Sequence, residues 1–423
     1  MNKRQEVSQH DRPSDAMRRR TKTLIGTGLV LMVLTGGLAQ DGAGVAAPSS
    51  FASASETAAL GSAVAKGRVD LATPTFSDPT SITNPLFPIS ALAQVLQLGA
   101  DKDGSLRHEI TLLPKSRTIE WRGQKVETLM SQFVAYQNGR ILEVAVDYFA
   151  QAVDGSVWYF GEKVDNYDDG FIADHEGSWL AGRDGPPGMI MPADPKVGDV
   201  YRPENIPGLV FEEVTVKAVN LTVDGPRGPV EGAIRVQERL QDGSTEAKFF
   251  APGYGEFRAL HRAEEEEVTV ALAVPIDALR GSSTAGLRVL SRGATKIFDA
   301  TPSKNWGRIS ATLETMAAAW EEDRAGDIPT LLKKQMTDAL DRLAAAVDAK
   351  KPAQARQAAI NVAGASLDLL LRYRPVTTVD FDRLDLWARQ LLVDGAADNR
   401  GDVAGDVASI EAIWNRVGHS ARG

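Results

Sequence analysis

Apolar and polar residues alternate over much of residues 75–280, which is the period of strands that bury one face. Two such runs, TLMSQFVAY and ILEVAVDYFA, flank Asn138-Gly139, and two more flank Asp154-Gly155. Asp169-Gly170 and Asp242-Gly243 are further dipeptides of the same kind. Asn-Gly and Asp-Gly favour two-residue hairpin turns, because both central positions of these turns need a positive φ. No helical period separates the runs. The pattern therefore predicts one curved, half-barrel-like antiparallel sheet over 75–280.

The apolar period changes to three and four residues in the C-terminal part of the chain. The first amphipathic stripe consists of Trp306, Ile309, Leu313, Met316 and Trp320. Similar stripes follow, and the short polar connections between them predict a four- or five-helix bundle over 303–420. The stretch 281–302 is rich in Gly, Ser, Thr and Arg, and we predict that it is a linker. The predicted fold class is therefore α+β.

Residues 1–39 have the three-part plan of a secretory signal peptide. Residues 1–23 carry seven Lys or Arg and three Asp or Glu, the apolar run LIGTGLVLMVL follows, and Gly37-Leu38-Ala39 is a small-residue cleavage site. An uncleaved membrane anchor is the alternative, although the run is short and glycine-rich for a bilayer span. Residues 40–74, rich in Ala, Ser and Gly, predict a disordered spacer. We expect export to the cell envelope or the extracellular space.

The amino-acid composition excludes several kinds of site and partner. The chain has no cysteine, which excludes disulfides, thiolate nucleophiles and Cys-ligated metals. Removal of residues 1–39 changes the formal net charge from −9 to −13, because this segment carries seven positive and three negative side chains. So acidic a chain is not expected to bind nucleic acid, nor an anionic membrane surface. Membrane contact is expected only through an uncleaved signal segment.

Aromatic residues are concentrated between Asp147 and Met191, where eight of the 27 in the chain lie. An aromatic-rich concave sheet can bury the apolar area of a ligand. The predicted ligand-binding residues are Tyr148, Phe149, Trp158, Tyr159, Phe160 and Trp179.

Two carboxyl groups are predicted to oppose each other in the same stretch. If Asp154-Gly155 is a two-residue turn, Phe149 faces Phe160, Gln151 faces Trp158 and Asp147 faces Glu162. Like charges directly opposite are unfavourable unless a cation, an Arg or a shared proton compensates. A carboxyl pair also serves general acid–base or glycosidic chemistry. The simpler alternative is a bulge or strand end that separates the two groups.

The sequence DNYDDGFIADHE, residues 165–176, partly matches a calcium-binding loop. Tyr167 stands where an oxygen ligand belongs and the flanks predict strands, so an ordinary hairpin loop is the alternative. The hypothesis is a Ca²⁺ site made by some of the carboxylates Asp147, Glu162, Asp165, Asp169 and Glu176.

The motif DYFAQ–DG–VWYFGE, followed by GSWLAGRDGPPGMIMPADPKVGDVYR and KFFAPGYGEF, resembles a group of exported bacterial proteins of unassigned function. The similarity covers roughly residues 80–262. A second stretch, LRYRPVTTVDFDRLDLWARQLLVD, is similar to a helical segment of secreted bacterial proteins. The resemblance implies export and a β-domain, and it implies no catalytic or cofactor residue.

The chain contains no G-x-S-x-G, P-loop or H-E-x-x-H motif. Whether it is an enzyme stays open, with the balance against catalysis. The expected function is a non-catalytic exported protein that binds an apolar ligand or another envelope protein on its aromatic sheet. One alternative is a secreted hydrolase that uses Asp147 and Glu162, with glycans as a candidate substrate class. The other is a Ca²⁺-stabilised structural module.

Overall fold

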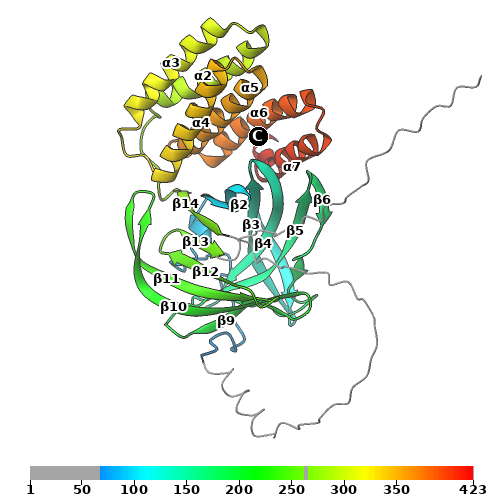
Figure 1. The fold of residues 1–423 in the computed structure, drawn as a ribbon. Coiled ribbons are helices and arrows are strands. Elements are labelled where there is room, and N and C mark those ends of the chain that lie inside the picture. The colour runs from blue at the N-terminus through cyan, green and yellow to red at the C-terminus, as the bar shows by residue number, and fades with distance from the viewer. Residues whose placement is uncertain (1–66, 262–264, 423) are drawn as a thin grey trace, which may run out of the picture.

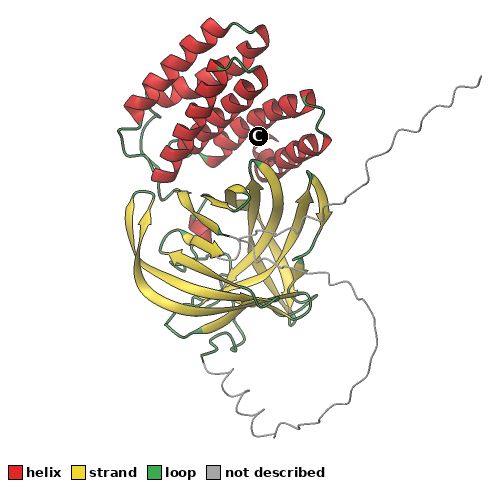
Figure 2. Cartoon of the chain, viewed as in Figure 1, coloured by secondary structure: helices red, strands yellow, loops and turns green. Residues whose placement is uncertain are grey.

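The computed structural model describes residues 67–261 and 265–422. An antiparallel sheet precedes a set of helices, and the helices lie at one end of the curved sheet (Figures 1 and 2). The predicted α+β class and order are confirmed. The predicted signal peptide and most of the predicted spacer lie outside the described residues.

The sheet has 14 strands. They are β1 Gln94–Asp101, β2 Gly104–Trp121, β3 Gln124–Gln137, β4 Arg140–Gln151, β5 Val157–Asp168, β6 Phe171–Asp174, β7 Trp179–Leu180, β8 Gly188–Met191, β9 Val200–Ile206, β10 Val210–Gly225, β11 Gly228–Leu240, β12 Thr245–Ala251, β13 Gly255–His261 and β14 Glu266–Val274. A short 3-10 turn, η1 Ile89–Ala91, precedes β1.

The strand order is β6-β5-β4-β3-β2-β1-β14-β13-β12-β11-β10-β9, with β7 and β8 also paired to β5. The sheet curves until β8 packs against β9, and Gly188 lies so close that a Cβ there would meet the Pro203 carbonyl oxygen at 1.8 Å. No ladder joins β8 to β9 among these described strands. We call this junction the seam.

Two of the predicted Xaa-Gly hairpin turns form as expected. Asn138 and Gly139 have φ of 51° and 77°, and Asp169 and Gly170 have φ of 50° and 77°. The turn at Asp154-Gly155 differs, because β4 ends at Gln151 and β5 begins at Val157. The connection is a five-residue loop in which the Asp154 side chain accepts a hydrogen bond from the Ser156 amide.

Six α-helices follow in the described residues: α2 Ala285–Ala300, α3 Trp306–Asp323, α4 Thr330–Asp348, α5 Pro352–Leu370, α6 Val376–Ala396 and α7 Arg400–Val417. Five of them, α3 to α7, lie within 303–420, in agreement with the predicted four- or five-helix bundle. The short 3-10 turns η3 Thr301–Ser303 and η4 Gly418–Arg422 follow α2 and α7. The linker predicted over 281–302 was wrong for most of its length, because α2 occupies it. Thr284 caps this helix by accepting from the Leu287 amide, and an apolar stripe of Leu287, Leu290, Ala294, Ile297 and Phe298 is buried. The intervening Arg, Ser, Gly and Thr residues obscured that stripe in the sequence.

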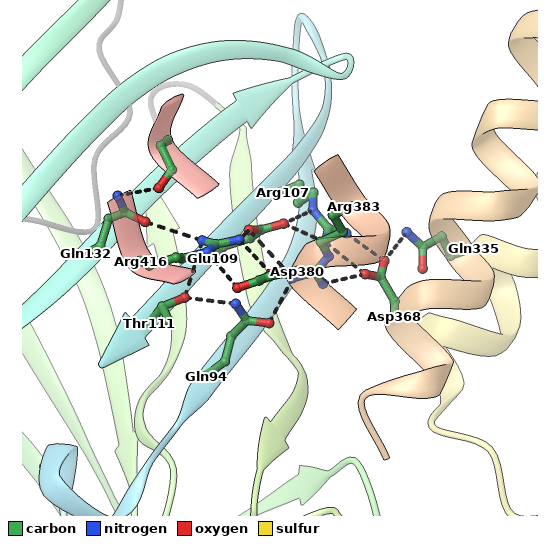
Figure 3. A network of polar contacts seen from close by, with 11 residues as sticks. Gln94, Arg107, Glu109, Thr111, Gln132, Gln335, Asp368, Asp380, Arg383 and Arg416 are labelled. Carbon is green, nitrogen blue, oxygen red and sulfur yellow. Dashed lines mark hydrogen bonds and ion pairs between the residues drawn. The ribbon is translucent and has the colours of Figure 1, made fainter. Parts of the chain in front are cut away.

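A buried ion network fixes the helices to the sheet (Figure 3). The Arg416 guanidinium of α7 donates to Glu109 on β2 at 2.6 Å and to Asp380 on α6 at 2.8 Å. Burial alone would raise the pKa of Glu109, but Arg383, Arg416 and Arg107 together hold it well below its usual range. These charges are therefore compensated inside the protein.

The network continues to helix α5 through Asp368. This carboxylate accepts from Arg107 of β2 at 2.6 Å and from Arg383 of α6 at 2.9 Å. The Gln335 amide of α4 adds a further hydrogen bond at 2.9 Å. Gln94 of β1 accepts from Arg383 and Gln132 of β3 accepts from Arg416, so three strands and four helices share a single set of polar contacts (Figure 3).

The β5–β6 turn makes a second contact with the helices. A Cβ on Gly170 would lie 1.9 Å from the Gly401 carbonyl oxygen of α7, so only glycine fits there. The Asp169 carboxylate also lies against Gly401, in the first turn of α7, where a negative charge is favourable. The turn of the predicted calcium loop therefore belongs to the interface between sheet and helices.

We predict that Gly170→Ala destabilises the protein more than Gly139→Ala does. Both glycines have a φ of 77°, and nothing lies within 4 Å of a Cβ on Gly139. Each variant should lose about 1–2 kcal/mol from the left-handed backbone, and Gly170→Ala about 1–3 kcal/mol more from overpacking against α7. Urea unfolding measures both. Equal losses would show that the turn does not pack on α7.

Replacement of Arg416 by Met should lower the unfolding free energy by about 3–5 kcal/mol, because it removes a partner from two buried carboxylates. Arg324→Met is the control. Arg324 and its partner Glu321 have side chains that are 44% and 67% exposed, and loss of such a pair should change the stability by under about 1 kcal/mol. Similar losses in the two variants would contradict a stabilising interface network.

Candidate functional site

Carboxyl groups from five strands line the inward face of the curved sheet. We call this set the acid row: Asp147 on β4, Glu162 on β5, Glu204 on β9, Glu212 on β10 and Glu238 on β11. All five side chains are buried. Strand register explains the row, because Asp147 pairs with Glu162, Glu204 pairs with Glu212, and Val214, two residues after Glu212, pairs with Glu238.

The acid row crosses the seam. Glu162 lies near one end of the strand order and Glu204 lies at the other. Trp179 on β7 connects them, since its backbone pairs with Glu162 and its indole N–H donates to Glu204 at 2.5 Å. On the far side of Glu162, the Tyr159 hydroxyl donates to Asp147 at 2.9 Å.

One end of the row is neutralised by a buried lysine. The Lys248 ammonium lies 2.7 Å from Glu238, 2.9 Å from Glu246 and 3.7 Å from Glu256. Burial alone would lower the pKa of Lys248, but these carboxylates raise it well above its usual range. The lysine is therefore charged.

The middle of the row has no such partner. Both carboxyl oxygens of Glu162, both of Glu212 and the Tyr201 hydroxyl are buried without a hydrogen-bond partner among the described residues. A buried polar group left unpaired costs about 1–3 kcal/mol, and an unpaired charge costs more. Glu162 and Glu212 therefore require a proton or a positive charge.

The pKa values of the row are raised, first by burial. Burial and the nearby Glu204, Asp147 and Glu143 raise the pKa of Glu162 well above its usual range, although the Tyr159 hydroxyl, which donates to Asp147, lies close enough to oppose the shift. Burial and the nearby Glu238 do the same for Glu212, although Lys248 opposes the shift.

The remaining carboxyls behave similarly. Burial raises the pKa of Asp147 to about 7, of Glu238 to about 8 and of Glu256 to about 7. The pKa of Glu204 is also well above its usual range, because of burial and then Glu212. Glu246 differs: its pKa is lowered, because Lys248 outweighs the opposing effect of burial. Without a cation, several of these groups carry a proton at neutral pH.

The six predicted ligand-binding aromatic residues are buried core rather than an open surface. Tyr148, Phe149, Trp158, Tyr159, Phe160 and Trp179 belong to one apolar cluster. The Phe149 ring stacks on Tyr159 at 4.9 Å between centroids, and Tyr159 meets the edge of Trp179 at 5.5 Å. The curvature of the sheet encloses these side chains, and two of them, Tyr159 and Trp179, donate to the acid row.

The predicted hairpin register was correct at one pair and wrong at two. Asp147 pairs with Glu162 as expected, whereas Phe149 pairs with Tyr159 and Gln151 with Val157. A β-bulge at Tyr148 shifts the register by one residue. The Tyr148 ring lies under the Arg117 guanidinium, 4.6 Å from its centroid.

The five carboxylates of the calcium hypothesis do not come together. Asp165 pairs with Lys163 and His175, Asp169 lies in the turn against α7, and Glu176 is exposed. Only Asp147 and Glu162 belong to the acid row. Within residues 67–261 and 265–422, no group of three or more His, Cys, Asp or Glu side chains has the arrangement of a metal site.

Sequence reasoning missed Glu204, Glu212, Glu238 and Lys248. A signal for two of them exists in the alternation of β10 and β11. Glu212 is in phase with the buried Val214 and Val216, and Glu238 with the buried Val236 and Leu240. An acidic residue at an inward position predicts a buried carboxyl, but not which distant strands meet there.

Comparisons with family models, with curated proteins and with solved structures found no match. None of the helices in the described parts of the chain has both the length and the apolarity needed to cross a bilayer.

We predict that the protein without added cations becomes less stable as the pH rises from 6.5 to 8.5. Carboxyls whose pKa is raised by folding stabilise the fold while protonated, and this stabilisation is lost as the pH passes their folded pKa values of about 7 and 8. Each carboxyl that loses its proton should remove roughly 1–2 kcal/mol. Thermal melts across this range measure the trend.

The double variant Asp147→Asn with Glu256→Gln should have a shallower pH profile, because the two carboxyls with a pKa of about 7 are replaced by amides that cannot ionise. The range begins at pH 6.5 because His108 is buried, which lowers its pKa to about 3, and this effect opposes the trend at lower pH. An unchanged profile in the double variant would show that these two side chains do not titrate in the folded protein.

Proposed function

We propose that this is an exported, non-catalytic binding protein that holds a positively charged ligand group on the acid row, in competition with protons. The observation that carries the proposal is that both Glu162 and Glu212 are buried with neither carboxyl oxygen paired in the described structure. Export rests on the signal-peptide pattern of residues 1–39.

Charge balance supports a cation as the ligand. The carboxyls of Asp147, Glu162, Glu204 and Glu212 are buried, and Lys248, which contacts the row at Glu238, is already engaged by Glu238 and Glu246. Protons neutralise the row at lower pH. At higher pH the carboxyls lose their protons and repel one another. A bound cation then neutralises the row in place of the protons.

The seam is the route that requires the fewest broken hydrogen bonds. Every other neighbouring pair along the strand order is joined by a ladder, whereas β8 and β9 pack without one. Separation there reaches Glu162 and Glu204 first, since they lie on opposite sides of it.

Two functions expected from the sequence, binding of an apolar ligand and hydrolysis, do not explain the unpaired carboxyls. An apolar ligand would need the six aromatic side chains, which pack against one another in the core. A hydrolase that used Asp147 and Glu162 would leave the unpaired carboxyl of Glu212 on β10 without a role.

We predict that cation binding to the full chain releases protons. Titration calorimetry near pH 7 in two buffers of different ionisation enthalpy should give different apparent heats, and their difference reports the protons released. Where protons compete, the affinity should rise about tenfold per pH unit for each proton displaced. The probes are Ca²⁺, Mg²⁺ and 1,4-diaminobutane.

The double variant Glu162→Gln with Glu212→Gln should lose both the binding and the proton release. The control, Glu120→Gln with Glu231→Gln, removes the same charge from exposed positions of β2 and β11 and should bind as the native chain does. Equal binding by both double variants would overturn the proposal.

A further inference from the structure

The protein already contains one group that neutralises part of the acid row. The Lys248 ammonium contacts Glu238 and Glu246 at 2.7 and 2.9 Å, with Glu256 at 3.7 Å, and its side chain is only 3% exposed. One primary ammonium therefore engages carboxyls from β11, β12 and β13 in this interior. A primary ammonium provides three N–H donors, which suits several acceptors that approach from different strands.

The other part of the row offers the same kind of acceptor without a donor. Glu162, Glu212 and the Tyr201 hydroxyl are the unpaired groups, and they lie on β5, β10 and β9. Glu204 connects the two glutamates, since it pairs with Glu212 and accepts from Trp179, whose backbone pairs with Glu162. The unpaired groups therefore come from three strands that meet at the seam.

The number of acceptors fits an ammonium better than a metal ion, because a primary ammonium has three N–H donors to satisfy. Ca²⁺ requires six to eight oxygen ligands at about 2.3–2.6 Å around one point, and Mg²⁺ requires near-ideal octahedral geometry. The described residues contain no such grouping. Two aromatic residues also lie beside the unpaired glutamate of β5: Trp179 is its backbone partner on β7, and the Tyr159 ring is in edge-to-face contact with Trp179 at 5.5 Å. Ring faces attract organic ammonium groups, whereas they do not ligate hard metal ions.

We propose that the ligand group held by the acid row is a primary ammonium, an organic cation that donates N–H hydrogen bonds to Glu162 and Glu212. This inference rests on the proposed function and narrows it to one chemical class. The Lys248 site shows the same chemistry within the chain, with β11 to β13 in place of β5, β9 and β10.

Three kinds of cation separate the possibilities. Titration calorimetry of the full chain at pH 8 and constant ionic strength should show binding of 1,4-diaminobutane, which has two primary ammonium groups. Tetramethylammonium, which has the charge but no N–H, should bind at least tenfold more weakly. Ca²⁺ and Mg²⁺ should also bind at least tenfold more weakly than the diamine.

Single variants locate the bound group. Glu162→Gln and Glu212→Gln should each lower the diamine affinity by about 10- to 100-fold, the range for a lost hydrogen bond to a charged group. Glu120→Gln and Glu231→Gln should each change it by less than about threefold. Thermal melts without ligand establish that every variant is folded before its affinity is compared.

The outcomes distinguish this inference from the function on which it rests. Tighter binding of Ca²⁺ or Mg²⁺ than of the diamine, lost in the Glu162→Gln and Glu212→Gln variants, would overturn the ammonium and leave a cation site on the acid row. Equal binding of tetramethylammonium and the diamine would also overturn it, because N–H donation would then be unnecessary. No binding by any probe, with no proton release, would overturn both proposals.

Discussion

Exclusion of water from charged side chains is the constraint on which this structure depends. The sheet curves so strongly, and the helices cover its end so closely, that two sets of ionisable groups are buried. At the interface, Arg107, Arg383 and Arg416 face Glu109, Asp368 and Asp380, so positive and negative groups are equal in number (Figure 3). In the interior, Lys248 is the base that contacts the row at its Glu238 end. Both sets are buried, but the interface has one arginine for each carboxylate, whereas the acid row has fewer basic groups than carboxyls.

Strand β2 shows how one alternating segment serves both environments. Arg107, Glu109 and Thr111 point to the helices and join the interface network. His108, between them, points to the interior, where its ring contacts Gln97 and Phe133. The period of two along a strand therefore places a neutralised charge cluster on one face of the sheet and an uncharged buried histidine on the other.

Much of this fold was predictable from local patterns. The hairpins at Asn138-Gly139 and Asp169-Gly170, the opposition of Asp147 and Glu162, and the stripe from Trp306 to Trp320 all follow from period and turn chemistry. Helix α2 was missed because polar residues interrupt its stripe. The acid row was mostly missed because the meeting of Glu162 with Glu204 depends on how far the sheet curves, which no local pattern specifies. The same curvature buries the six aromatic side chains in the core, whereas the sequence predicted that they line a binding surface.

The attachment of the helices has a mechanical consequence. Glu109 on β2, Arg140 on β4 and the Asp169-Gly170 turn all contact the helices, and they lie in the same half of the strand order as Asp147 and Glu162. Glu204, Glu212 and Glu238 lie in the other half, across the seam. The two halves form one continuous sheet through the β1–β14 ladder, and at the seam they meet without a ladder. Deprotonation of the row therefore generates repulsion across the seam, and the occupancy of the row by protons or by a cation sets the force between the two ends of the sheet.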